Sequence, residues 1–545
     1  MEREKLAEKG KEITPSGDVY EGDVVDGLPH GKGKLAFSYG DEYEGDFAEG
    51  KFHGKGTYTY ADKAWYTGDF AAGKCHGKGV YTFADKVVYE GDFADGKFHG
   101  KGIEIFPSGM VYEGDFFNDK KTGKGKMTFP SGDLYEGDFV DGKFHGKGKM
   151  TFHDGGVYEG DFDEGKRQGK GKQAFTDGTM YEGDFVDGQW EGKGKLAFPG
   201  EGTYEGDFFK GEYHGKGICT FGSGDRYEGD FVKGKFEGKG TLTSPEGITF
   251  CGDFSNNLPH GKGVQTGPEN TRYEGDFVNG FPYGKGRQTG PDGTVYEGDF
   301  IGFERTGKGK QISLSGTVYE GDFLDGAYHG KGKVVLPKDG IEYEGDFINY
   351  KPHGKGRLSY SDGYEYVGDL VEGQPHGKGM IRYADGNVYE GDLVEGKCEG
   401  KGKLNMPEDM VYEGDFLDDK FHGKGIKTYP RCYVYEGDFV EDSFCGKGKM
   451  TLHSGEIYEG DFLDGRYHGN GKLVYPTGAV YEGDFFEDEC HGKGTLTLPD
   501  GTVYSGDFVN GKHIDSGIFL WPDGELRECN IDDLRNSPVK EVAGG

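Results

Sequence analysis

The chain has 545 residues, of which 107 are glycine and 33% are hydrophobic, and its formal net charge at pH 7 is −34. This composition is too poor in apolar side chains for an ordinary globular core, whereas an aromatic content of 14% argues against intrinsic disorder. The negative charge disfavours binding to nucleic acid or to an anionic membrane surface, because phosphate groups would be repelled.

A block of the form Tyr-Glu-Gly-Asp-Phe recurs along the chain with a period of 23 residues. Its anchor tyrosine falls first at Tyr20 and last at Tyr504, and phenylalanine takes its place once, at Phe250. Counting the anchors gives 22 units. Self-similarity at a fixed period predicts an array in which each unit contacts its neighbours along the chain.

The unit at residues 135–157 shows how one repeat is patterned. In its first run, Tyr135, Gly137 and Phe139 share one face, while Glu136 and Asp138 share the other. The second run alternates in the same way, with glycine, methionine and phenylalanine on one face and lysine and threonine on the other. Alternation with a period of two is typical of strands, so each unit is predicted to be a β-hairpin.

The loop chemistry predicts how adjacent strands are aligned. The Pro-Ser-Gly sequence at 130–132 suits a three-residue hairpin loop, a type I turn completed by glycine in the left-handed region. With three loop residues, Met127 lies opposite Tyr135 and Gly125 lies opposite Gly137. A two-residue loop would shift the register by one residue and place methionine opposite glutamate.

We therefore predict an all-β fold, an elongated single-layer antiparallel β-meander built from tandem β-hairpin repeats. One face would be aromatic, with glycines leaving room for rings that lie flat over the sheet. The other face would carry cross-strand ion pairs, with Glu136 opposite Lys126 and Asp138 opposite Lys124. Each pair is worth only ~0.2–1 kcal/mol.

The pattern Tyr-x-Gly, then His-Gly-Lys-Gly and a turn glycine, resembles the MORN repeat over residues 14–529. Three units depart from it, with Val24, Leu370 and Leu393 in place of the usual aromatic residue. The resemblance implies an all-β repeat array with roles in scaffolding, cytoskeletal assembly and membrane-associated complexes, and it does not imply catalysis.

The two ends of the chain depart from the repeat. Residues 1–13 are predicted to be a cap or tail. Met1 to Lys11 either forms a short helix over the first hairpin, or Met1 to Gly10 is frayed. Residues 530–545 are predicted to be a C-terminal tail. A long aromatic face that its own rings cover only in part exceeds the apolar patch that soluble monomers usually expose, so we expect a homodimer. The strand before the tail contains Phe519 and Trp521, which we interpret as a self-association end.

Three successive units near the middle lose apolar side chains from the aromatic face. Their departures are either drift in a tolerant array or a hinge or docking patch, and the lost burial predicts the fastest internal hydrogen exchange there. The residues concerned are Phe250, Cys251, Asn257, Gln265, Gly267, Gln288, Gly290, Gln311 and Ser313.

No catalytic, cofactor or metal site is predicted. The histidine of His-Gly-Lys-Gly recurs in 13 units, but equivalent residues one repeat apart would be separated by roughly 9.5 Å, too far to share a metal ion. The repeated carboxylates lack the singular environment of a catalytic pair. The eight cysteines form no Cys-x-x-Cys pair and are interpreted as free thiols in a reducing compartment.

The function that we expect is a non-enzymatic scaffold for protein partners. No secretory segment, long apolar run or lipidation motif is recognised, so we expect a cytoplasmic location at the cytoskeleton, a cilium or a flagellum. Two alternatives stay open. One is a tethering module for membranes or phosphoinositides, which the net charge disfavours; the other is a regulatory subunit that docks an enzyme.

Overall fold

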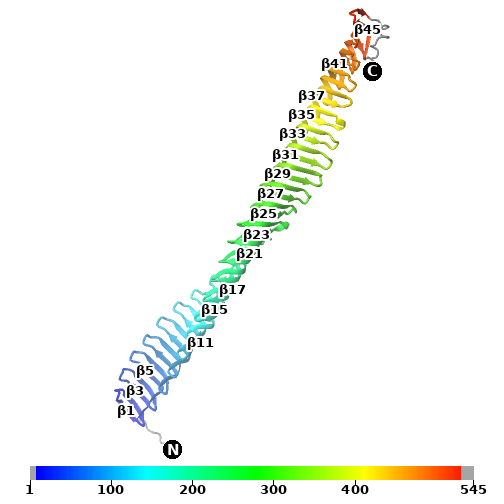
Figure 1. The fold of residues 1–545 in the computed structure, drawn as a ribbon. Coiled ribbons are helices and arrows are strands. Elements are labelled where there is room, and N and C mark those ends of the chain that lie inside the picture. The colour runs from blue at the N-terminus through cyan, green and yellow to red at the C-terminus, as the bar shows by residue number, and fades with distance from the viewer. Residues whose placement is uncertain (1–7, 529–545) are drawn as a thin grey trace. The chain divides into compact units, whose positions relative to one another are not determined.

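The computed structural model describes residues 8–528. The chain divides into two compact units. The first runs to Pro268 and includes 277–280, and the second comprises 269–276 and continues from Phe281. Within each unit, consecutive strands pair antiparallel in chain order, hairpin after hairpin (Figure 1). The predicted all-β meander of hairpin repeats is thus confirmed within each unit.

The strands of the first unit are β1 (Glu8–Ile13), β2 (Val19–Val25), β3 (Leu28–Ala36), β4 (Glu42–Ala48), β5 (Lys51–Thr59), β6 (Trp65–Ala71), β7 (Lys74–Thr82), β8 (Val88–Ala94), β9 (Lys97–Ile105), β10 (Val111–Phe117), β11 (Lys120–Thr128), β12 (Leu134–Val140), β13 (Lys143–Thr151), β14 (Val157–Asp163), β15 (Lys166–Ala174), β16 (Met180–Val186), β17 (Gln189–Phe198), β18 (Gly202–Phe209), β19 (Glu212–Phe221), β20 (Arg226–Val232), β21 (Lys235–Thr243), β22 (Thr249–Ser255) and β23 (Leu258–Thr266).

Strand β24 (Arg272–Val278) and the short 3-10 turn η1 (Pro268–Asn270) contribute residues to both units. The second unit continues with β25 (Phe281–Thr289), β26 (Val295–Ile301), β27 (Glu304–Ile312), β28 (Val318–Leu324), β29 (Ala327–Leu336), β30 (Ile341–Ile348), β31 (Lys351–Tyr360), β32 (Glu365–Val371), β33 (Gln374–Arg382), β34 (Val388–Val394), β35 (Lys397–Asn405), η2 (Pro407–Asp409), β36 (Val411–Leu417), β37 (Lys420–Tyr429), β38 (Tyr433–Val440), β39 (Ser443–Leu452), β40 (Ile457–Leu463), β41 (Arg466–Val474), β42 (Val480–Phe486), β43 (Glu489–Thr497), β44 (Val503–Val509), β45 (Lys512–Leu520) and β46 (Leu526–Glu528).

The predicted register is confirmed between β11 and β12. Met127 lies opposite Tyr135 and Gly125 lies opposite Gly137. The three-residue loop at 130–132 is also present, closed by a 2.9 Å hydrogen bond from the Phe129 amide to the carbonyl of the residue after the loop. Turn chemistry together with face segregation therefore sufficed to fix this pairing.

Two kinds of loop alternate along the meander, and the second kind, a two-residue loop, was not predicted. Between β12 and β13 only Asp141 and Gly142 form the loop, with φ angles of 49° and 82°. Positive φ at both central residues defines a type I′ turn, whose twist matches that of the flanking strands. The Asp-Gly dipeptide was a recognisable signal for this turn.

A bulge interrupts the tight hairpin at the Gly-Asp dipeptide. In β12 and β13, Gly137 lies opposite Gly148, yet the next residue, Asp138, lies opposite His145. The two skipped residues include Gly146, which has a φ of 57°, and a Cβ there would lie 2.9 Å from the Asp138 carboxylate. The strict alternation predicted for the second run is therefore wrong at Gly146, because the bulge turns the backbone toward the aspartate.

The anchor tyrosine lies over the paired glycines. Tyr135 is fully buried, and a Cβ built on Gly148 would lie 2.5 Å from its ring. The ring stacks on Phe144, with centroids 3.8 Å apart, and meets Phe139 and Phe162 edge-on at 5.2 and 5.0 Å. Each tyrosine thus joins its own hairpin to the next one, and this aromatic layer is the core of the repeat.

The N-terminal end differs from the helix considered above. Residues Glu8–Ile13 form strand β1, which pairs with β2 and places Glu12 opposite Tyr20. Residues 1–7 and 529–545 lie outside the described part of the chain. Within residues 8–528, no helix is both long and apolar enough to cross a membrane.

Replacing Gly148 with alanine should destabilise the repeat that contains it by ~1–3 kcal/mol, because the new methyl group would overlap the Tyr135 ring. We expect amide exchange to accelerate in β12–β14 and not in distant repeats. Gly156→Ala is the matched control, since its nearest neighbour is the carboxylate of Asp154 at 3.2 Å. Equal protection in both variants would contradict the packing role.

Candidate functional site

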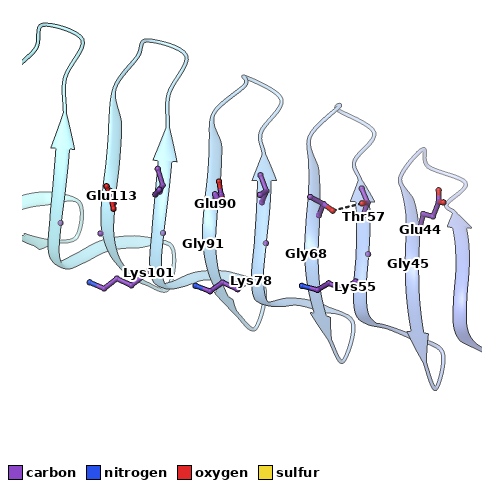
Figure 2. A pocket seen from close by; sticks show the side chains of 18 of the residues that line it. Glu44, Gly45, Lys55, Thr57, Gly68, Lys78, Glu90, Gly91, Lys101 and Glu113 are labelled. Carbon is purple, nitrogen blue, oxygen red and sulfur yellow. Dashed lines mark hydrogen bonds between the residues drawn. The ribbon is translucent and has the colours of Figure 1, made fainter.

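The face opposite the aromatic layer forms an open groove. Its floor is a row of glycines, and rows of lysines and glutamates lie to either side, as Figure 2 shows for Lys55, Lys78, Glu44 and Glu90. In the first unit one groove runs from Glu21 to Gly137, with a volume of about 1990 Å³. In the second unit, residues 274–368 and 367–495 line grooves of about 1690 and 1880 Å³.

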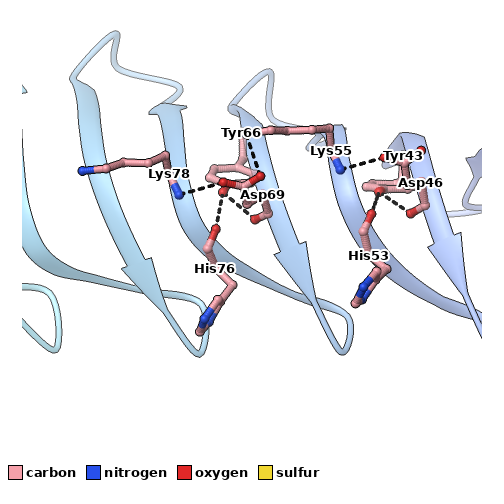
Figure 3. A network of polar contacts seen from close by, with 8 residues as sticks. All are labelled: Tyr43, Asp46, His53, Lys55, Tyr66, Asp69, His76 and Lys78. Atoms are coloured by element: carbon pink, nitrogen blue, oxygen red, sulfur yellow. Dashed lines mark hydrogen bonds and ion pairs between the residues drawn. The ribbon is translucent and has the colours of Figure 1, made fainter.

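The lysine of the Gly-Lys-Gly sequence is held by an aspartate of the following repeat. Lys55 Nζ lies 2.6 Å from Asp69 Oδ1, while Asp69 Oδ2 accepts a 3.0 Å hydrogen bond from the Lys78 amide. The hydroxyl of Tyr66 donates to the Asp69 carbonyl at 2.8 Å (Figure 3). One aspartate therefore couples the buried tyrosine, the preceding lysine and the following strand.

The ion pair changes the acidity of the aspartate. The Lys55 ammonium, assisted by the Lys78 amide, lowers the pKa of Asp69 from its ordinary value, against the opposing effect of burial. The lysine side chain is 69% exposed, so a single pair contributes little to stability. The lysine row is therefore paired, as predicted, and is not a free cradle for phosphate.

The recurring histidines act mainly through their backbone. The carbonyl of His76 accepts from the Tyr66 hydroxyl at 3.4 Å, in addition to the bond that this hydroxyl gives to Asp69. The imidazole of His145 contacts the Asp163 carboxylate at 3.2 Å. Across residues 8–528 there is no group of three His, Cys, Asp or Glu that could hold a metal ion.

The cysteines within the described residues are free thiols. Burial raises the pKa of Cys75 and Cys490 to about 11 and that of Cys398 to about 12. Because the thiolate is the reactive form, these three cysteines are poor nucleophiles at neutral pH. Cys529 lies outside the described residues.

The first repeat of the predicted central patch packs its anchor residue as the other repeats do. Phe250 is only 4% exposed, lies opposite Gln265, and occupies the anchor position over Gly263. Cys251 is exposed on the other face. Asn257 replaces a turn glycine, and its side-chain oxygen accepts a 2.8 Å hydrogen bond from the Phe236 amide.

The glutamines at 288 and 311 belong to a polar cluster that sequence reasoning missed. Arg305 donates from Nε to Gln288 at 3.1 Å and from a terminal nitrogen to Gln311 at 2.6 Å. Gln311 in turn donates to the Tyr328 hydroxyl at 3.0 Å, and the guanidinium lies 5.2 Å from the Tyr296 ring centroid. The sequence did carry a signal for this cluster, because Arg305 stands at a repeat position that is often aromatic.

The small residues of the patch lie at turns. Gly290 donates to the Thr294 carbonyl at 2.8 Å, and the Ser313 hydroxyl accepts from the Thr317 amide at 3.1 Å. Gly267 lies between β23 and η1. The structure brings Gln288 and Gln311 together through Arg305, while the role of the stretch as a hinge or docking patch stays a prediction.

The predicted self-association end is partly internal. Phe519 is 1% exposed and its ring centroid lies 4.8 Å from that of Tyr504. Trp521 is half-buried, with its ring 6.4 Å from Phe519. Self-association through this end stays a prediction.

Comparison with known proteins gives one family. The model described as "MORN repeat" matches twelve segments within residues 20–295 and nine within 319–525. The segments leave out 296–318, the repeat that contains Arg305 and Gln311. No curated protein matches the chain.

Similar solved structures are remote. The TCP domain of SAS-4 (dCPAP) from Drosophila melanogaster, in complex with a proline-rich motif of Ana2 (dSTIL), is 11% identical; the match covers 32% of this chain and 89% of that chain, with a TM-score of 0.21. The TCP10 domain of Danio rerio CPAP, in complex with a STIL peptide, is 13% identical; the match covers 50% and 96%, with a TM-score of 0.17. Likenesses of this size carry no argument about function.

The aspartate contacts should be sensitive to acid. Because the folded-state pKa of Asp69 lies below the ordinary 3.8, its contribution is fully present above pH 3.8 and is lost as the pH falls through the lowered pKa. We expect the protection factor of the Lys78 amide, corrected for intrinsic exchange, to fall in that range and to be constant from pH 5 to 7. In Asp69→Asn this acid dependence should disappear; if it persists, another group is responsible.

Removing the Arg305 guanidinium should lower the local stability of the strands around it. Arg305→Lys cannot donate to two glutamines with the same fixed fork, so we expect about tenfold lower amide protection in β25–β27, equivalent to about 1.4 kcal/mol. Arg226→Lys is the control, because Arg226 makes an exposed ion pair with Glu228. Unchanged exchange in Arg305→Lys would show that the cluster does not stabilise these strands.

Proposed function

Because the chain belongs to the MORN-repeat family, we propose that this repeat scaffold protein is non-enzymatic and holds protein partners at the cytoskeleton in the cytoplasm, including that of a cilium or flagellum. The observation that supports the proposal best is the repetition of one polar face. Its lysines and aspartates form the same contacts in repeat after repeat, as in Lys78–Asp92, Lys124–Asp138 and Lys401–Asp415.

Repetition of this kind suits binding better than catalysis. A catalytic pair of acids needs two environments that separate its pKa values, whereas a repeated face offers many equivalent places. A repeat array also extends its surface with each added unit, so several partners can be held side by side. The pairing of the lysines with aspartates counts against recognition of anionic lipid, since few ammonium groups are left for phosphate.

The proposal is tested by finding what lies beside the protein in its own cell. Localisation of the tagged chain combined with proximity labelling should recover cytoskeletal or ciliary proteins repeatedly. Recovery of membrane lipid-modifying enzymes, together with cosedimentation on vesicles containing anionic lipid, would instead favour the tethering alternative.

The second unit carries an exposed apolar row that supports self-association. One side chain per repeat lies at the turn edge, 43–49% exposed, from Leu324 to Val509. The row comprises Leu324, Ile348, Val371, Val394, Leu417, Val440, Leu463, Phe486 and Val509. Because soluble monomers seldom expose long contiguous apolar surface, we propose that two copies cover it.

Light scattering on the full chain at micromolar concentration should therefore give twice the mass of one chain. Replacing Leu417, Val440 and Leu463 with serine should shift the mass toward a monomer, since each change removes apolar area at the turn edge. A monomer in the unsubstituted protein would overturn the dimer and leave the scaffold proposal standing.

A further inference from the structure

One stretch of the first groove lacks a cation that other repeats supply. Two residues after the Lys of Gly-Lys-Gly, many repeats have a second lysine opposite the glutamate row, as in Lys126–Glu136 at 3.7 Å and Lys172–Glu182 at 3.0 Å. Three successive repeats have Thr57, Val80 and Ile103 at this position instead. Figure 2 shows this part of the groove.

Glu90 lies at the centre of that stretch. Its cross-strand neighbours are aliphatic on both sides, Val80 on β7 and Ile103 on β9. Glu90 is exposed, both neighbours are half-buried, and within residues 8–528 neither Glu90 nor Glu113 has an ion-pair partner within 4.0 Å.

A comparable stretch elsewhere is satisfied internally. Glu228 lies between Ile218 and Thr241, but Arg226 supplies a cation 2.6 Å away. Glu90 therefore lacks the cross-strand cation that the same row receives in other repeats. Glu113 lies opposite Ile103 on one side and Lys126 on the other, and that lysine pairs with Glu136 at 3.7 Å.

The lysines on the other side of the groove do not fill this role. Lys78 and Lys101 are each held at 2.6 Å by Asp92 and Asp115. The stretch thus offers unpaired carboxylates above an aliphatic surface. A Lys or Arg side chain fits both features, because its alkyl stem can pack on Val80 and Ile103 while its charged head reaches Glu90.

The repeat spacing selects the conformation of the occupant. Glu90 and Glu113 are equivalent residues one repeat apart, or two strands at ~4.8 Å each, about 9.6 Å. A polyproline-II segment rises ~3.1 Å per residue and returns to the same face after three residues, about 9.3 Å. Seven residues of α-helix, close to two turns, advance about 10.5 Å, and a β-strand reverses its face after three residues.

We propose that the groove around Glu90 docks a segment of a protein partner in the polyproline-II conformation with Lys or Arg at every third residue. Its basic side chains lie along the Glu90–Glu113 row, one turn of the segment for each repeat. This docking rests on the proposed scaffold function and names the chemistry of one partner surface.

A labelled peptide of five Lys-Pro-Pro triplets tests the proposal by fluorescence anisotropy with the full chain. We expect saturable binding that Val80→Lys combined with Ile103→Lys weakens about tenfold, because each new ammonium pairs with Glu90 as in other repeats and repels the peptide. The substituted chain should fold, since lysine occupies this position in many repeats.

Two controls test for non-specific attraction of the basic peptide to an acidic protein. One varies the position of the added charge and the other varies the order of residues in the peptide. Met380→Lys combined with Ile426→Lys adds the same charge at the same repeat position in the second unit and should leave binding unchanged. A peptide of equal composition with its lysines in one block should bind more weakly.

Equal weakening by both double variants, or equal affinity for both peptides, would overturn the proposal as general charge attraction. Stronger binding of a helical peptide with lysines seven residues apart would overturn the polyproline-II occupant. Proximity labelling that recovers protein partners while this peptide fails would leave the scaffold function intact and reject only this docking mode.

Discussion

The structure depends on the close approach of each anchor tyrosine to the glycines beneath it. The ring of Tyr135 occupies the space that side chains at Gly137 and Gly148 would take, so the strands and the ring form one layer without a second sheet. Its neighbours Phe139 and Phe162 then meet it edge-on from its own and the following repeat. A chain with so few apolar residues can bury a core in this way because each ring covers two hairpins.

The polar face follows from the same arrangement. The Tyr66 hydroxyl fixes the Asp69 backbone, and the bulge that follows Gly68 directs the aspartate side chain toward Lys55 and the Lys78 amide. The ion pairs are exposed and individually weak, yet their position is set by a buried tyrosine. The groove therefore repeats the same contacts along its length. A repeat with different residues, such as the aliphatic neighbours of Glu90, is a candidate binding place.

Much of this could be read from the sequence. The period of two predicted which residues share a face of the sheet. The Pro-Ser-Gly loop predicted that Met127 lies opposite Tyr135, because a shift of one residue would have placed methionine opposite glutamate. The bulge at Gly146 was not predictable from alternation, because a period of two does not reveal the positive φ that Gly146 adopts beside the Asp138 carboxylate. The hydrogen bond from Arg305 to Gln311 was not predicted either, although arginine at an often aromatic position was a signal, because the two residues lie six positions apart on β27. The loss of apolar residues near 288–313 was seen correctly, but its compensation by a polar cluster required the structure.

The burial of the anchor tyrosines is tested most directly by a spectrophotometric pH titration of the intact chain. Burial raises the pKa of these phenols above the ordinary 10, to about 12 for Tyr273 and Tyr296, and moves that of Tyr135 further upward. We predict that at pH 11, with the β-sheet circular dichroism signal unchanged, only a minority of the 36 tyrosines is ionised. Ionisation of the whole set near pH 10 in a chain that keeps its β-sheet signal would contradict the packing of the rings over glycine.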